Sequence, residues 1–163
     1  MTTKIAINGL GRIGRMVLRV ALNREDVEVV ALNASYPPET IAHLLKYDTT
    51  HGRFNQTVEA TENGIKVDGK EIKLVSDRNP ENLPWGALDI DIVVEATGKF
   101  NHGDRANAHI KAGAKKVILT GPSKGGEVQT IVKGVNDHEL DVMQYDVFSN
   151  ASVSYTHLTL PTT

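Results

Sequence analysis

A glycine-rich segment near the amino terminus holds the residues best placed for chemistry in this chain of 163 residues. It reads Gly9-Leu10-Gly11-Arg12-Ile13-Gly14 and has the spacing G-x-G-x-x-G. Such spacing combines a tight turn, a backbone that an anion can approach and a helix packed closely behind it. The free amides of Arg12 and Ile13 would then face the anion. An ordinary glycine-rich turn is the alternative, so the flanking elements matter.

The flanking elements favour a nucleotide site. Residues 5–8 are an apolar run of strand length, and residues 27–33 form a second one. Between them, residues 13–23 carry apolar side chains at helical spacing, which predicts a helix that buries Ile13, Val17, Val20 and Ala21. A glycine turn inside such a βαβ unit binds the pyrophosphate of a dinucleotide. The predicted contacts are Asn8, Gly9, Gly11, Arg12, Ile13 and Gly14.

The end of the second strand bears on which dinucleotide is bound. An acidic residue at this place, about 20 positions past the motif, would accept hydrogen bonds from the adenosine ribose. This chain instead has Asn33-Ala34-Ser35. A carboxylate would repel the 2′-phosphate of NADP, whereas Ala34 leaves room and Ser35 offers a hydroxyl donor. The sequence therefore favours NADP. The alternative is that Asn33 and Ser35 bind the plain ribose hydroxyls of NAD.

The remaining sequence predicts the fold. Further helices are expected over residues 39–46 and 104–112, and further strands over 90–95, 116–120, 129–133 and 146–149. The dipeptides Asn63-Gly64 and Asp68-Gly69 divide residues 57–75 into short segments, which is typical of antiparallel hairpins. We predict an α/β fold, Rossmann-like, with a doubly wound and mostly parallel sheet and an inserted antiparallel meander.

Composition excludes several classes of function. The formal net charge of −2 and the absence of a basic run give no sign of nucleic-acid binding, and no segment has the length and apolarity of a membrane span. The chain has no cysteine, which excludes disulfides, thiolate metal sites and thiol catalysis. Its six histidines are scattered, so no metal is predicted. The loop Gly121–Gly126 lacks phosphate-loop spacing, and the carboxylates Asp89, Asp91 and Glu95 are expected to be solvated or capping groups.

Four segments together resemble one enzyme family. They are Ala6–Arg15, Tyr47–Arg53, Glu95–Phe100 and Ser149–Ser152, which resemble phosphorylating glyceraldehyde-3-phosphate dehydrogenases in order and spacing. The resemblance runs from Lys4 to Ser152, and Asn33-Ala34-Ser35 is similar to the NADP-preferring, biosynthetic branch. It implies a cofactor domain for NADP or NAD, in a cytoplasmic homotetramer that acts on a triose phosphate and inorganic phosphate. Residues 47–53 are expected to serve folding or subunit contacts.

The resemblance also implies roles for individual residues. Arg12 and Ile13 would lie along the pyrophosphate and Arg78 near the adenine, while Thr97, Gly98 and Phe100 would line the adenosine side. Thr120 would lie beside the nicotinamide ribose. Ser152 is similar in place to a serine near bound substrate phosphate.

The chemistry that the resemblance implies needs a cysteine. In that family, a thiolate attacks the aldehyde carbon, the hemithioacetal gives hydride to the nicotinamide, and inorganic phosphate cleaves the thioester. The cysteine follows Ser-Asn-Ala-Ser directly, and this chain has Val153 there. We therefore expect residues 1–152 to be an NAD(P)-binding domain, residues 153–163 a non-native tail, the catalytic domain absent and the chain inactive. The alternatives are an erythrose-4-phosphate dehydrogenase fragment and a non-catalytic nucleotide-binding or scaffolding module.

Overall fold

A computed structural model of the chain describes residues 2–150. The helices are α1 (Arg12–Leu22), α2 (Pro38–Lys46) and α3 (Gly103–Lys111), with short 3-10 turns at Pro80–Asn82 and Asp137–Glu139. The strands are β1 (Thr3–Asn8), β2 (Val27–Asn33), β3 (Val58–Thr61), β4 (Gly64–Val67), β5 (Lys70–Val75), β6 (Ile92–Glu95), β7 (Lys116–Leu119), β8 (Gln129–Thr130) and β9 (Val147–Ser149). Most of these elements begin and end within two residues of the predicted bounds.

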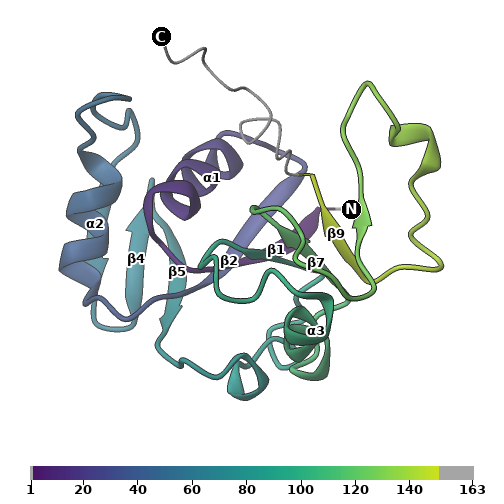
Figure 1. Ribbon diagram of the computed structural model, residues 1–163. Coiled ribbons are helices and arrows are strands. Elements are labelled where there is room, and N and C mark those ends of the chain that lie inside the picture. Colours follow the sequence, from purple (N-terminus) through teal and green to yellow (C-terminus); the bar gives the residue numbers. More distant parts are fainter. Residues whose placement is uncertain (1, 151–163) are drawn as a thin grey trace, which may run out of the picture.

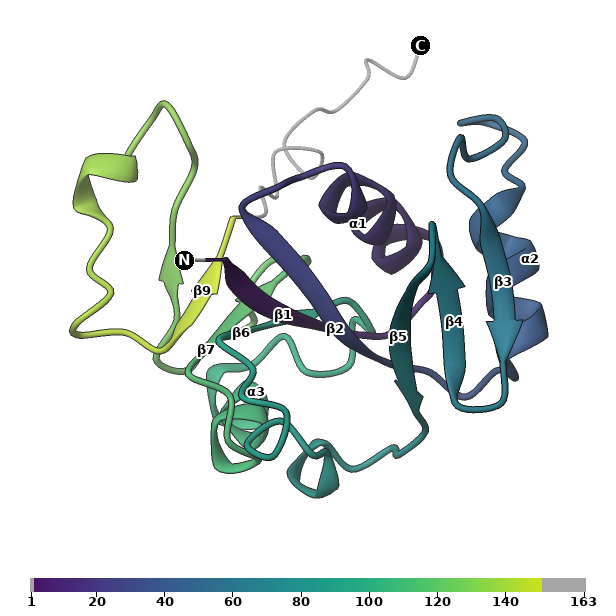
Figure 2. The same ribbon diagram turned by 180° about the vertical axis from the view of Figure 1, so that it is seen from behind.

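The strands of this described part form one sheet in the order β3-β4-β5-β2-β1-β6-β7-β9-β8. Helices α1 and α2 lie over one face and α3 over the other (Figures 1 and 2). The central strand β1 pairs in parallel with β2 on one side and with β6 on the other. The chain therefore winds first one way from β1 and then the other, which confirms the predicted doubly wound fold. In such sheets, ligands bind beyond the carboxyl ends of the strands where the winding reverses.

The predicted meander is present, and it is part of the main sheet. Strand β4 pairs antiparallel with β3 on one side and with β5 on the other, as the two Asx-Gly turns indicate. Strand β5 also pairs in parallel with β2, from Ala31 opposite Lys73 to Asn33 opposite Val75. The last strand of the meander thus brings the segment after Val75 to the same sheet edge as the end of β2.

The buried face of α1 differs in part from the predicted one. Ile13 and Val20 are 54% and 63% exposed, whereas Leu18 is fully buried and Ala21 is 6% exposed. The helix packs on the sheet through Gly14, Leu18 and Ala21, because the small Gly14 lets its first turn approach the sheet closely. Leu18 joins the core cluster that includes Ile41 and Leu45 of α2. Of the four predicted residues, Ala21 is buried and Val17 packs against the core, so only Ile13 and Val20 were assigned wrongly. Prediction from apolarity alone gave no weight to glycine as a packing residue.

A long excursion separates β8 from β9 at one side of the sheet (Figure 1). It carries exposed apolar side chains, with Val135 71% and Met143 92% exposed. Its far end is held by Lys116, whose ammonium group donates to the carbonyl oxygens of Val142 (2.7 Å) and Tyr145 (2.8 Å). Between residues 2 and 150, no helix has the length and apolarity needed to cross a bilayer.

Candidate functional site

Three polar side chains stand in register at the carboxyl ends of the central strands. Asn8 of β1 lies opposite Asn33 of β2 and opposite Glu95 of β6. All three are buried, with exposed fractions of 2%, 7% and 0%. Asn33 Nδ2 donates to Asn8 Oδ1 (2.7 Å), and Asn8 Nδ2 donates to Glu95 Oε2 (2.5 Å). This polar row lies at the carboxyl ends of β2, β1 and β6, the sheet edge at which ligands are expected.

The glycine turn, Gly9–Gly14, follows β1 and the polar row. A side chain at each of its three glycines would meet different surroundings. Gly9 has φ +94°, and a Cβ there would meet Thr97 Cγ2 at 2.8 Å. A Cβ on Gly14 would collide with the Gly9 carbonyl oxygen. A Cβ on Gly11 would meet nothing within 4 Å. The first and third glycines therefore hold the turn against β6 and α1, while the second leaves open space above the backbone.

The first turn of α1 is suited to an anion. Gly11 is the N-cap and provides no side-chain cap, and the first turn holds no acidic residue. The first backbone bond of the helix runs from the Arg15 amide to the Gly11 carbonyl (3.1 Å). The preceding amides, those of Arg12, Ile13 and Gly14, have no carbonyl partner within the helix, as at any helix start. These donors, together with the helix dipole, favour a phosphate group over the open face of Gly11.

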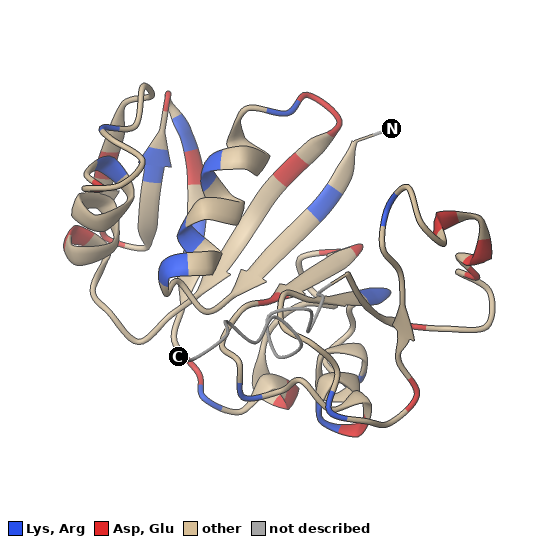
Figure 3. Cartoon of the chain, turned by 45° about the horizontal axis from the view of Figure 1, so that its top comes forward, with Lys and Arg blue, Asp and Glu red and all other residues tan. Residues whose placement is uncertain are grey.

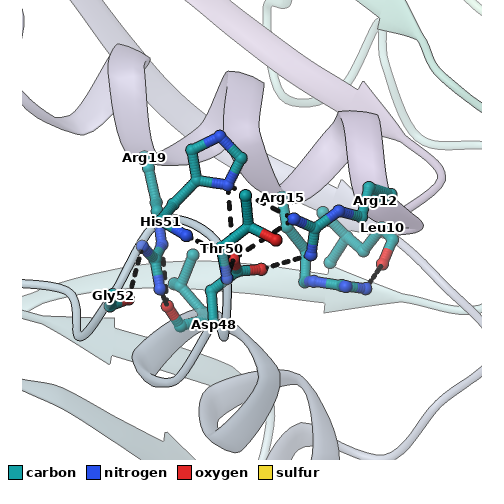
Figure 4. Close-up of polar contacts among 9 residues, drawn as sticks. Leu10, Arg12, Arg15, Arg19, Asp48, Thr50, His51 and Gly52 are labelled. Atoms are coloured by element: carbon teal, nitrogen blue, oxygen red, sulfur yellow. Dashed lines mark hydrogen bonds and ion pairs between the residues drawn. The ribbon is translucent and has the colours of Figure 1, made fainter.

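The guanidinium of Arg12 is turned away to a partner inside the protein. It donates to both carboxylate oxygens of Asp48, at 2.5 and 3.2 Å, and the Asp48 side chain is 2% exposed (Figure 4). Asp48 also accepts from the backbone amides of Thr50 (2.9 Å) and His51 (2.8 Å). The Arg12 guanidinium, followed by the His51 amide, holds the pKa of Asp48 well below its usual value. Arg12 can therefore serve an anion through its amide.

The two other arginines of α1 also have partners inside the protein (Figure 4). Arg15 donates to the Leu10 carbonyl (3.0 Å), and Arg19 donates to the carbonyls of Leu45 (2.6 and 3.0 Å) and Gly52 (3.1 Å). Figure 3 shows basic and acidic residues interspersed over the molecule. Arg12 and Arg19 thus tie the end of α2 and the segment after it to α1, whereas Arg15 is bonded to the glycine turn.

The end of β2 has the predicted small residues and an arginine nearby. Asn33 points inward and is bonded to Asp77 twice, through Asn33 Nδ2 to the Asp77 carbonyl (2.8 Å) and the Asp77 amide to Asn33 Oδ1 (3.0 Å). These bonds fix the segment after β5 beside Ala34 and Ser35. Arg78 follows directly, is exposed, and makes no side-chain hydrogen bond or ion pair among the described residues. The sequence separates Arg78 from Ser35 by 43 positions, so no local spacing indicates that the segment after β5 lies beside the end of β2.

Ser35 also lines a surface hollow of about 450 Å³, together with Tyr36, Pro37, Asn63 and Ser76. This hollow lies between the loop that leads into α2, the turn from β3 to β4 and the end of β5. The hollow of about 820 Å³ at Arg24, Glu28 and Lys70 lies at the other end of β2. Size is therefore a poor guide to the site here, since that hollow is far from the glycine turn.

The residues expected on the adenosine and nicotinamide sides follow β6 and β7. Thr97 lies beside Gly9, and Gly98 has φ +73°. Phe100 is half-buried, with its ring edge-on to His109 at 6.3 Å between centroids. Thr120 is held by the Glu95 carbonyl, which accepts from its amide (3.1 Å) and its hydroxyl (3.0 Å). The structure thus brings the predicted site residues from Asn8 to Thr120 to one sheet edge. Ser152, Val153 and the tail lie outside the described residues.

Sequence reasoning missed the buried groups below this edge. Glu95 was expected to be solvated or capping, yet it is fully buried and accepts from His109 Nε2 at 2.7 Å. His109 is fully buried on α3, and its Nδ1 atom lies 3.0 Å from Trp85 Nε1. The spacing of His109 three residues after buried Ala106 was the available signal, because it places the histidine on the inner face of α3. The described residues contain no cluster of metal-binding side chains.

Comparison with known proteins agrees with this geometry. Residues 3–103 match the family described as glyceraldehyde 3-phosphate dehydrogenase, NAD binding domain. Glyceraldehyde-3-phosphate dehydrogenase 2 of Staphylococcus epidermidis is 74% identical over 152 residues, and that of Staphylococcus aureus is 71% identical over the same length. These alignments cover 93% of this chain and 45% of each relative, so the chain spans about half the length of the curated relatives it matches. This chain belongs to the family of NAD-binding domains of glyceraldehyde-3-phosphate dehydrogenases.

Proposed function

We propose that this chain binds a nicotinamide dinucleotide across the ends of β1, β2 and β6, with its pyrophosphate on the amides of Arg12 and Ile13. The observation that carries the proposal is the open face of Gly11 at an uncapped helix start, between two glycines that have no room for a side chain. When bound, the dinucleotide supplies a hydride acceptor. The chain's own residues orient it: the amides bind the pyrophosphate, and Thr97, Gly98 and Phe100 face the adenosine.

The proposal extends to a preference for NADP over NAD. Ala34 and Ser35 place no carboxylate beyond the end of β2, and the exposed Arg78 follows the adjacent strand without a partner among the described residues. A guanidinium and a hydroxyl can both donate hydrogen bonds to a phosphate monoester, and the guanidinium also forms an ion pair with it. A neutral ribose hydroxyl forms no such ion pair. Asn33 is already bonded to Asn8 and Asp77, which speaks against its binding plain ribose hydroxyls.

For the full-length protein, we propose phosphorylating oxidation of glyceraldehyde 3-phosphate to 1,3-bisphosphoglycerate, or the reverse reaction, in a cytoplasmic homotetramer. Support comes from the named relatives, which are glyceraldehyde-3-phosphate dehydrogenases. The 163 residues of this chain contain no cysteine to form the thioester. We therefore propose that the chain by itself is a nucleotide-binding module without aldehyde turnover. The alternative substrate, erythrose 4-phosphate, has no observation in its favour.

Titration of the purified chain with NADP⁺ and NAD⁺ tests the preference. We expect NADP⁺ to bind more tightly, and Ala34→Asp to weaken NADP⁺ by on the order of a hundredfold through repulsion of the 2′-phosphate. The same substitution at Ala60→Asp, on the exposed face of β3, is the matched control and should change neither affinity. Equal loss of both dinucleotides in Ala34→Asp would contradict the NADP assignment. Binding of neither by the unmodified chain would contradict the dinucleotide site.

A further inference from the structure

A relay of buried polar side chains runs from the glycine turn to the opposite face of the sheet. It consists of Asn8, Glu95, His109 and Trp85, of which the last three are fully buried and Asn8 is 2% exposed. Glu95 is on β6, next to the central strand β1, His109 is on α3, and Trp85 precedes β6 in the chain. The cofactor contacts proposed above use only one end of this relay.

The hydrogen-bond directions in the relay follow from Trp85. An indole nitrogen can only donate, so Trp85 Nε1 donates to His109 Nδ1 over 3.0 Å. His109 Nδ1 is therefore an acceptor, and the ring proton is on Nε2. His109 Nε2 donates this proton to Glu95 Oε2 at 2.7 Å, where Asn8 Nδ2 also donates at 2.5 Å. The distance of 3.3 Å between Asn8 Nδ2 and His109 Nε2 thus joins two donors that share one oxygen.

The other carboxylate oxygen holds a residue of the cofactor site. Glu95 Oε1 accepts from the Thr97 amide (2.9 Å) and the Thr97 hydroxyl (2.5 Å). Thr97 is the residue against which Gly9 packs, since a Cβ on Gly9 would meet Thr97 Cγ2 at 2.8 Å and Thr97 N at 3.0 Å. The orientation of the Glu95 carboxylate therefore sets the positions of both Thr97 and Asn8, on either side of the glycine turn.

We propose that His109 is a positioning residue for the dinucleotide site: its Nε2 proton, fixed there by Trp85, orients Glu95 and through it Thr97 and Asn8. The inference rests on the proposed function of the same site. Four neutral donors surround a carboxylate with no exposed surface, so each donor restricts its rotation. Loss of the imidazole donor leaves Oε2 to Asn8 alone and frees the carboxylate to turn away from Thr97.

Two substitutions at His109 separate positioning from packing. His109→Phe keeps a ring of similar size but has no donor, whereas His109→Gln has an amide that can donate to Glu95 and accept from Trp85. We expect His109→Phe to raise the Kd for NADP⁺ about tenfold, and His109→Gln to restore it to within about threefold of the unmodified protein. Ile72→Val, in the core on β5, is the control for loss of stability alone and should leave the Kd unchanged.

A second measurement needs no variant. Trp85 is the one tryptophan of the chain, so its indole gives a single ¹H–¹⁵N signal. We expect saturation with NADP⁺ to shift this signal, because the relay joins the buried indole to Thr97 and Asn8. The imidazole ¹⁵N signals of His109 should show a protonated Nε2 and an unprotonated Nδ1. A merely structural histidine would leave the indole signal indifferent to the dinucleotide.

The possible outcomes distinguish this inference from the proposed function. If the unmodified chain binds NADP⁺ while its indole signal stays in place, or His109→Phe binds equally well, the positioning role is refuted and the dinucleotide site stands. If the unmodified chain binds neither NADP⁺ nor NAD⁺, the proposed function fails and this inference fails with it. A shifted indole signal together with rescue by His109→Gln supports the positioning role.

Discussion

Alanine substitution should affect two glycines of the same turn in different ways, one in stability and the other in dinucleotide affinity. Gly14→Ala places a methyl group into the Gly9 carbonyl oxygen, whereas Gly11→Ala places it where no atom lies within 4 Å. Gly11 has φ −69°, which alanine adopts without strain. We therefore expect Gly14→Ala to reduce stability, and Gly11→Ala to reduce dinucleotide affinity while the fold stays intact.

Two opposing contributions decide whether Gly14→Ala stabilises or destabilises the protein. Alanine inside a helix is favoured over glycine by about 1 kcal/mol, so helix propensity alone predicts a more stable protein. A collision with backbone cannot be relieved by a rotamer change, and over-packing of this kind costs about 1–3 kcal/mol and displaces the turn. A Cβ this close to the Gly9 carbonyl oxygen places the cost at the upper end of this range, so the net loss is about 2 kcal/mol. In a domain of this size, this loss lowers Tm by about 4–8 °C.

For Gly11→Ala the stability effects nearly cancel. Reduced freedom of the unfolded chain contributes about 0.4–1 kcal/mol, and the poorer N-cap costs a similar amount. Tm should stay within about 3 °C of the unmodified protein. The methyl group occupies the path of the pyrophosphate and holds it about 1 Å farther from the Arg12 and Ile13 amides, which should weaken NADP⁺ binding on the order of a hundredfold.

Calorimetric unfolding and NADP⁺ titration of the two variants check both halves of this prediction. A higher Tm for Gly14→Ala would refute the steric argument from the Gly9 carbonyl. Unchanged NADP⁺ affinity in Gly11→Ala would place the pyrophosphate elsewhere. Gly52→Ala, at a site with φ +74° and open space outside the turn, controls for glycine replacement and should leave NADP⁺ affinity unchanged.

Three further predictions concern charged groups. Because Arg12 lowers the pKa of Asp48, this carboxylate contributes stability that is complete above about pH 4 and is lost as the pH falls further. Between pH 7 and pH 2.5, the Tm of Asp48→Asn should therefore fall less steeply than that of the unmodified protein. Parallel curves of Tm against pH for the two proteins would disprove this. Lys115, whose pKa Asp91 raises, contributes stability below its ordinary pKa of 10.5 that is lost as the pH rises past it; unfolding from pH 8 to 11.5 should show a smaller decline in Lys115→Met. Lys116→Met removes the hydrogen bonds to the Val142 and Tyr145 carbonyls, so amide hydrogen exchange in residues 140–146 should accelerate by about tenfold. Unaltered exchange would show that Lys116 does not hold this segment.

The fold was readable from the sequence because its signals are local. Strand β2 occupies the predicted residues Val27–Asn33, and the Asx-Gly turns at Gly64 and Gly69 mark the meander. The parallel pairing of β5 with β2 was not predicted, because no local pattern records which distant strand a meander joins. The exposed stripe of Ile13 and Val20 was misassigned for a related reason: helical spacing identifies a face, and tertiary packing decides which face is buried.

The candidate site was predictable where it follows the chain and hidden where it crosses the fold. The glycine turn and the Ala34-Ser35 pair are each a contiguous segment, so the sequence pattern alone predicts what they bind. Arg78 was placed near the adenine only by the family resemblance, and it is the bond between Asn33 and Asp77, across 44 positions, that brings the segment before it to the end of β2. The connection between Glu95 and His109 likewise joins a strand to a helix on the opposite face, and a lone histidine in a polar helix gives little warning of it.

The polar row at Asn33, Asn8 and Glu95 also bears on how the parallel strands find their alignment. Apolar strands of similar composition can slide past one another at small cost, because one valine replaces another. A slip of β1 by one residue would bring Ile7 opposite Glu95 and leave a buried carboxylate without its amide donor, which is a heavy penalty. We therefore expect the polar row to fix the register of β1, β2 and β6 during folding, before any ligand is bound.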